Sequence, residues 1–149
     1  MSRYELATLR SIIVEGGDAR QIDAALEPVT ALQDSNTIAP LLLMLNDESE
    51  DSAMWSLLHA AEQFDDRTYI GRFLEAVTGM VVGSSRWASI AMMRVLNSDA
   101  SRAELARQVR SSPEFTRKAV VFICEAINGR DPRFLAKTVA ITTAALNGS

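Results

Sequence analysis

"LNDESEDSAMWSLLHAAEQFDDRTYIGRFLEAV" occupies residues 45–77 and contains two successive series of apolar residues at helical spacing. In each series the apolar residues recur three or four positions apart, which places them on one face of a helix. The first series is Met54, Leu57, Leu58 and Ala61, and the second is Tyr69, Ile70, Phe73, Leu74 and Val77. Asp65 and Asp66 separate the two series, and an aspartate at such a position favours the start of a helix. The stretch predicts one helix over about residues 51–63 and another from the aspartates to near residue 83.

Similar start and stop signals divide the rest of the chain into about nine expected helices joined by short turns. Helix starts are indicated at Asp18, Pro40, Ser84 or Ser85, Ser101, Pro113, and Asp131 with Pro132. Pro28 falls inside one apolar series, where we expect a kink or a break. No stretch alternates regularly between apolar and polar residues, so no strand is predicted.

The succession of short helices favours an all-α fold. We expect an array of antiparallel helical hairpins of the HEAT-like kind, with a compact orthogonal helix bundle as the alternative. No linker or shift in composition interrupts residues 1–149, which we expect to form a single all-helical domain. The apolar faces predict a core that includes Leu57, Leu58, Phe73, Leu74, Val77, Ile90, Leu105, Ile123 and Leu135.

Charged residues are distributed unevenly along the chain. Residues 21–66 contain ten acids and no Lys or Arg, whereas residues 67–149 contain twelve bases against six acids. Residues 1–20 hold three charges of each sign, so the net charge of −4 conceals an acidic segment followed by a basic one. This asymmetry predicts a surface suited to a cationic partner, and a solvated acidic helix pair without a partner is the alternative interpretation.

The chain offers few residues for catalysis or metal binding. His59 is the sole histidine, and Cys124 is the sole cysteine and lies in the apolar run "AVVFICEAI". A typical zinc site needs more such ligands. A calcium loop that starts at Asp47 fails, because Ser52 stands where glycine is needed and Leu58 where a bidentate glutamate is needed. We therefore expect a protein that is not an enzyme, with no metal and no cofactor.

The expected compartment is the cytoplasm. The first residues carry charges without an apolar segment, and the longest apolar runs are far shorter than the roughly 20 residues that a membrane span needs. A single thiol cannot form an intramolecular disulfide, which favours a reducing compartment. The arginines from Arg86 onward are spread over several expected helices and the pI is about 5.0, which opposes nucleic-acid binding.

The acidic stretch surrounds a tryptophan. On a helix that starts at Asp51, Trp55 follows one turn later, and Glu62 lies only about 20° around the helix from Trp55. A tryptophan beside two carboxylates is typical of an interface anchor that contacts Arg or Lys on a partner. Packing of Trp55 against a neighbouring helix is the alternative. The predicted partner-binding residues are Asp47, Glu48, Glu50, Asp51, Trp55, His59, Glu62, Asp65, Asp66 and Tyr69.

Three segments within residues 40–102 resemble one protein family. They are "MWSLLHAAE" with the acidic turn before it, "FDDRTY", and "RW" followed by "RVLN". In these segments the chain resembles the immunity protein 30 family of bacterial polymorphic toxin and contact-dependent inhibition systems. The resemblance implies a small cytoplasmic protein that binds a cognate toxin domain and blocks it, and such toxins are often nucleases with basic surfaces.

An acidic face on the inhibitor would compete for a basic surface of this kind and would accelerate association. We therefore expect a monomer that inhibits its toxin by forming a stoichiometric complex, with no membrane or nucleic-acid partner. A helical scaffold or adaptor that binds a peptide or protein partner in a groove is the alternative function.

Overall fold

The computed structural model describes residues 2–148, which form nine α-helices, two short 3₁₀ helices and no strand. The α-helices are α1 (Ser2–Val14), α2 (Ala19–Ala31), α3 (Ile38–Leu43), α4 (Asp51–Ala61), α5 (Asp66–Gly83), α6 (Ser85–Leu96), α7 (Asp99–Val109), α8 (Glu114–Arg130) and α9 (Leu135–Leu146). The 3₁₀ helices are η1 (Ser35–Thr37) and η2 (Pro132–Phe134). The all-α prediction is confirmed for the described residues.

Three helices start at residues that the sequence predicts. The side chains of Asp18, Asp65 and Ser84 accept hydrogen bonds from backbone N–H groups in the first turns of α2, α5 and α6. On α2 the Gln21 side chain also accepts from the backbone N–H of Asp18, at 2.9 Å. These bonds satisfy N–H groups that have no partner inside their helix, so the local sequence determines these three starts.

Two local predictions differ from the structure, one of them only in part. The N-cap of α7 is Ser98 rather than Ser101, and the Ser98 hydroxyl accepts a hydrogen bond from the backbone N–H of Ser101. Both serines can cap a helix, and the earlier one places Ser101 in the first turn. Of the kink or break expected at Pro28, the break does not occur, because α2 continues past it. Pro28 removes one hydrogen bond to the carbonyl of Ala24, and both residues are exposed, so water can bond to that carbonyl.

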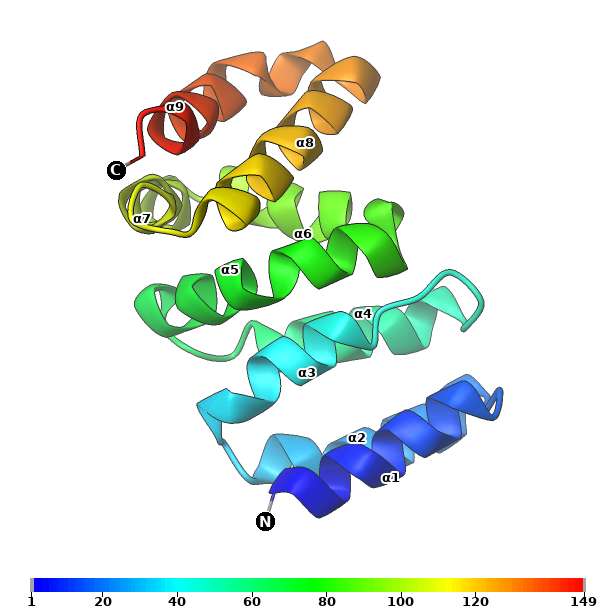
Figure 1. The fold of residues 1–149 in the computed structure, drawn as a ribbon. Coiled ribbons are helices and arrows are strands. Elements are labelled where there is room, and N and C mark those ends of the chain that lie inside the picture. Colours follow the sequence, from blue (N-terminus) through cyan, green and yellow to red (C-terminus); the bar gives the residue numbers. More distant parts are fainter. Residues whose placement is uncertain (1, 149) are drawn as a thin grey trace.

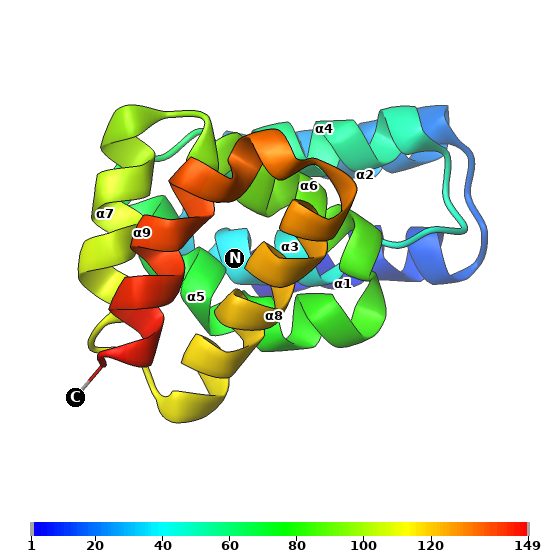
Figure 2. The same ribbon diagram turned by 90° about the horizontal axis from the view of Figure 1, so that it is seen from above.

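The helices stack from one end of the molecule to the other in chain order (Figure 1). α1 packs against α2 at the end that holds the N-terminus, and α8 packs against α9 at the opposite end. Seen from above, α9 lies between α7 and α8 (Figure 2). The longest helix, α5, contacts α3, α6, α7 and α8. Helix α5 therefore connects the helices before it in the stack with those after it.

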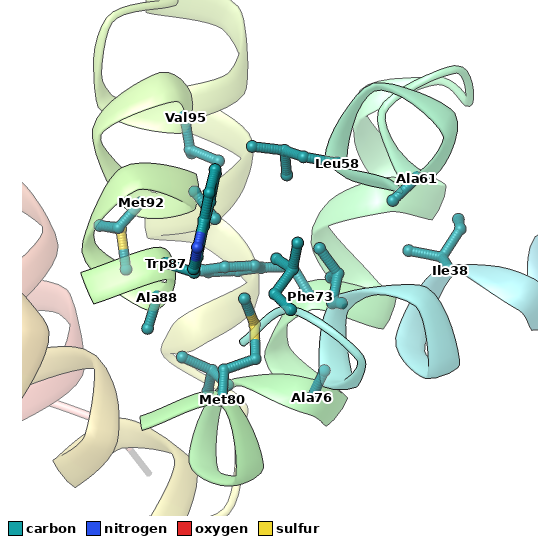
Figure 3. Packing of buried hydrophobic residues seen from close by; sticks show 14 of the residues in the cluster. Ile38, Leu58, Ala61, Phe73, Ala76, Met80, Trp87, Ala88, Met92 and Val95 are labelled. Atoms are coloured by element: carbon teal, nitrogen blue, oxygen red, sulfur yellow. The ribbon is translucent and has the colours of Figure 1, made fainter. Parts of the chain in front are cut away.

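Buried apolar residues from Leu6 to Ala145 form one cluster. In Figure 3 the ring of Trp87 from α6 lies near Phe73 and Met80 of α5 and near Leu58 of α4. Trp87 and Phe73 have no exposed surface. The contact between α4, α5 and α6 therefore contains the largest fully buried side chains and lies at the centre of the core.

All but two of the predicted core residues are buried. Ile90 is only partly buried and packs against the core, and Leu135 is 54% exposed. The prediction for Leu135 is wrong because α9 begins at this residue and its buried face starts one turn later, at Thr138. Ile141 and Ala145 continue that buried face.

This difference in burial predicts a difference in stability between two Leu→Ala variants. Leu57→Ala removes a side chain with no exposed surface, so it should lower the free energy of unfolding by about 2–5 kcal/mol. Leu135→Ala makes the same chemical change at an exposed position and should cost well under about 1 kcal/mol. Urea unfolding followed by circular dichroism measures both, and equal losses would contradict the described core.

Candidate functional site

The carboxylates that flank Trp55 are paired with arginines of the same chain. Asp51 of α4 accepts two hydrogen bonds from Arg86 of α6, at 2.7 and 3.3 Å. Glu62, just after α4, accepts two from Arg94 of α6, at 2.6 and 2.8 Å. The bonds to the carboxylates raise the pKa of both arginines. The charge of Asp51 and Glu62 is therefore largely compensated within the protein.

Two tryptophans lie between these ion pairs. The rings of Trp55 and Trp87 meet edge to face, with centroids 5.3 Å apart. The Arg94 guanidinium lies 5.5 Å from the centroid of the Trp55 ring, and that of Arg86 lies 5.1 Å from the Trp87 ring. We call this set the Trp–Arg ladder, and its members are Asp51, Trp55, Glu62, Arg86, Trp87 and Arg94. The ladder joins α4 to α6 through the edge-to-face contact of the two rings, the arginines that lie over them and charge-assisted hydrogen bonds.

Trp55 has both a core side and a surface side. Its ring packs against the buried Trp87, yet the residue is only partly buried. One turn along α4 the exposed ring of His59 lies 5.8 Å from the Trp55 ring. Trp55 therefore packs against a neighbouring helix, as one of the two sequence-based alternatives expects, and its ring keeps some surface beside His59. Its role as an interface anchor stays a prediction.

The acidic loop before α4 is shaped by contacts that the sequence pattern does not reveal. The Asn46 side chain accepts hydrogen bonds from the backbone N–H groups of Glu48 and Ser49, at 3.0 and 2.8 Å. Asp47 accepts one from the Ser84 hydroxyl at 2.9 Å. Glu50 accepts one from the backbone N–H of Ala19, the first residue of α2, at 3.1 Å. The loop is thereby tied to α2 and to the start of α6.

The last three predicted site residues lie around the start of α5. Asp65 caps the helix, and hydrogen bonds from Thr68 lower the pKa of its carboxyl. Asp66 accepts a hydrogen bond from the Ser101 hydroxyl of α7 at 2.6 Å. Tyr69 is only 6% exposed, and burial raises the pKa of its phenol. Its ring lies 6.2 Å from that of the buried Phe73, so Tyr69 belongs to the core and offers little surface to a partner.

A groove lies between the α1–α2 turn and the α3–α4 loop, which are on the same side of the molecule (Figure 1). Its volume is about 620 Å³. The residues that line it are Arg10, Ile13, Val14, Gly16, Gly17, Asp18, Leu43, Met44, Asn46, Glu48, Ser49 and Glu50. Three acids thus stand against one arginine, beside the exposed apolar side chains of Val14 (77%) and Leu43 (49%). We call this the acidic groove, and its two borders come from distant parts of the sequence.

The structure places Cys124 inside the core, where burial raises the pKa of its thiol to about 12. A thiol in this state is a poor nucleophile at neutral pH. Among residues 2–148 no group of three or more His, Cys, Asp and Glu side chains is placed to hold a metal ion. In the same part of the chain no helix combines the length and the apolar composition that crossing a membrane requires.

A groove that combines exposed apolar side chains with charged groups at its rim is typical of a surface that binds another protein. Residues 10–105, well over half of the chain, match the family model described as Immunity protein 30. The chain belongs to the immunity protein 30 family, which confirms the resemblance carried by residues 40–102. The matched region contains the acidic groove and the Trp–Arg ladder, and it ends before α8. No curated protein and no solved structure matched the chain.

The ladder predicts a measurable coupling between Glu62 and Arg94. In a double-mutant cycle with Glu62→Ala and Arg94→Ala, we expect a coupling energy of about 1 kcal/mol in the free energy of unfolding, because the pair is bidentate and Glu62 is only 20% exposed. The more exposed pair Arg72 and Glu75 serves as the control and should show a smaller coupling. Coupling no larger than that of the control would mean that the ion pair does not hold α4 to α6.

Proposed function

We propose that this chain is an immunity protein that binds a cognate bacterial toxin domain in the cytoplasm and blocks it by forming a stoichiometric complex. Membership of the immunity protein 30 family supports a toxin as the partner. In this proposal the protein performs no chemistry of its own. It covers the active site or the substrate path of the toxin, which we expect to be a nuclease.

The observation that carries the proposal is the acidic groove. Internal pairing reduces the charge that the acidic segment can offer, because Asp51 and Glu62 bind arginines of α6. The carboxylate of Glu48 makes no ion pair within residues 2–148, and it lies in the groove beside exposed apolar side chains. A basic and partly apolar surface, such as the substrate-binding face of a nuclease, complements this combination in both charge and polarity.

The proposed contact surface continues from the groove along α4. This helix starts next to Glu50, and its exposed side then carries Trp55 and His59 one and two turns later. Within the Trp–Arg ladder, Trp87 and Arg94 contact the ring of Trp55 and fix its position. A rigid aromatic group whose position is set before binding loses little conformational entropy on association, which is the physical requirement for an interface anchor.

Co-expression with a toxin domain tests the proposed function directly. The candidate toxin is the domain encoded by the gene immediately upstream, since an immunity gene is expected directly after its toxin gene. We expect cell protection, a complex of equal numbers of the two chains by light scattering, and loss of toxin activity in proportion to the added protein. A complex that forms while the toxin keeps its full activity would favour the scaffold or adaptor alternative.

Glu48 is expected to act on association through its long-range field. Glu48→Lys should slow association with the toxin several-fold at low ionic strength and should flatten the dependence of the rate on salt. Glu75→Lys makes the same charge change at an exposed site outside the groove and should leave the rate nearly unchanged. Stopped-flow measurements over a salt series compare the two variants, and equal rates for both would place the contact outside the acidic groove.

Replacing Trp55 should change both the stability of the protein and the dissociation rate of the toxin complex, whereas replacing His59 should change the dissociation rate alone. Trp55→Ala should lower the free energy of unfolding by about 3 kcal/mol, since it removes the contact with Trp87. It should also speed dissociation of the toxin complex. His59→Ala should speed dissociation while leaving stability nearly unchanged, because the residue is exposed. If neither variant alters the dissociation rate, the outer side of α4 lies outside the contact.

A further inference from the structure

The outward side of α8 carries a regular series of exposed residues. Phe115, Lys118, Phe122, Glu125 and Gly129 are all exposed and follow one another at steps of three and four positions. We call this series the α8 seam. Phe115 is 63% and Phe122 is 53% exposed, which is unusual for two phenylalanines on one helix. The alternation of three and four residues is the spacing with which two helices pair along their length.

Helix α8, which carries the seam, lies with α9 at the end of the stack opposite α1 and α2 (Figure 1). Next to it, between α8 and α9, is a hollow of about 270 Å³ lined in part by Val121, Phe122 and Leu146. Leu146 is itself 73% exposed. At the end of a helical stack, a polar outer face normally separates the core from water. Phe115 borders a second hollow, which α5 and α7 also line, so the exposed side of α8 carries apolar surface between its neighbours that would be stabilised by a covering partner.

The charges of the seam are complementary to a second copy of the same seam. Consider two copies of α8 that pack antiparallel, with Phe122 of one copy against Phe122 of the other. A residue that precedes Phe122 in one copy then faces the residue that follows Phe122 by the same number of positions in the other copy. Lys118, four positions before Phe122, forms an exposed ion pair with Glu114 of its own helix at 3.4 Å, and in this arrangement it also lies close to Glu125 of the other copy, three positions after Phe122. The two-fold symmetry produces this pair twice.

The outer positions of the seam match in the same way. Phe115 and Gly129 are each seven positions from Phe122, so the aromatic ring of one copy faces the glycine of the other. A side-chain atom added at Gly129 would meet nothing within 4 Å, so the surface there is open to a ring from outside. Glu114 and Arg130 are each eight positions from Phe122, and they form a second pair of opposite charges at the rim.

We infer that this protein forms a two-fold symmetric dimer in which the α8 seams of two copies pack antiparallel around Phe122. We assign a second copy of the chain as the partner of the seam, because Lys118 lies near Glu125 of the other copy and Phe115 faces Gly129, so the seam complements itself in charge and in size. The inference differs from the monomer expected from the sequence, and it does not depend on the identity of the toxin. It leaves both acidic grooves free, since they lie at the outer ends of the dimer.

Sedimentation equilibrium of the purified full chain tests the dimer and gives its dissociation constant. We expect a reversible dimer whose dissociation constant rises at least tenfold in Phe122→Asp. Val82→Asp is the matched control, because Val82 is 86% exposed and belongs to α5 rather than to the seam. Circular dichroism and urea unfolding of both variants show whether each remains folded, so that loss of the dimer is not confused with loss of the fold.

A charge exchange tests the antiparallel register independently of the phenylalanine. Lys118→Glu and Glu125→Lys should each weaken the dimer, since each places like charges opposite one another. The double variant should restore it, because the opposite charges meet again with their places exchanged. A chain that is monomeric at all concentrations, a dimer unaffected by Phe122→Asp, or a double variant no stronger than the single ones would each overturn the inference.

Discussion

The contact between α4 and α6 depends on long side chains that meet across the space between the two helices. Trp87 is fully buried, and Trp55 meets it edge to face while Arg86 and Arg94 close the two ends by binding carboxylates. Helix α5 lies between these two helices in the chain and contributes Phe73 to the same core. Because α5 also contacts α3, α7 and α8, the position of α6 relative to α4 affects the packing of both halves of the molecule.

Most of the fold follows from local patterns. Capping residues such as Asp65 and Ser84 act within three positions, and the apolar faces repeat within one or two turns, so both can be read from short stretches. The errors occur where local patterns leave two choices. Ser98 and Ser101 are both able to cap α7, and Leu135 lies at a helix end, where the inward face of α9 has not yet begun.

The candidate site was less predictable, because its contacts join distant residues. The acidic stretch contains no Lys or Arg, but Asp51 is paired with Arg86, 35 positions away. No periodic pattern in the sequence links positions so far apart. The acids therefore look uncompensated in the sequence, although arginines of α6 compensate them in the fold. The acidic groove is another example, since Val14 and Leu43 come together only through the packing of the first helices. The sequence correctly indicated an acidic region, and the fold determines which carboxylates remain available.

The hydrogen bond from the Ala19 N–H to Glu50 has a consequence for the motion of the molecule. It joins the first turn of α2 to the loop before α4, and Glu50 is one of the residues that line the acidic groove. Breaking it leaves a helix N–H without its partner and removes this direct connection between the two borders, while the hydrogen bond from Ser84 to Asp47 still holds the loop to the start of α6. The backbone amides on both sides of the broken bond should then exchange with deuterium at linked rates.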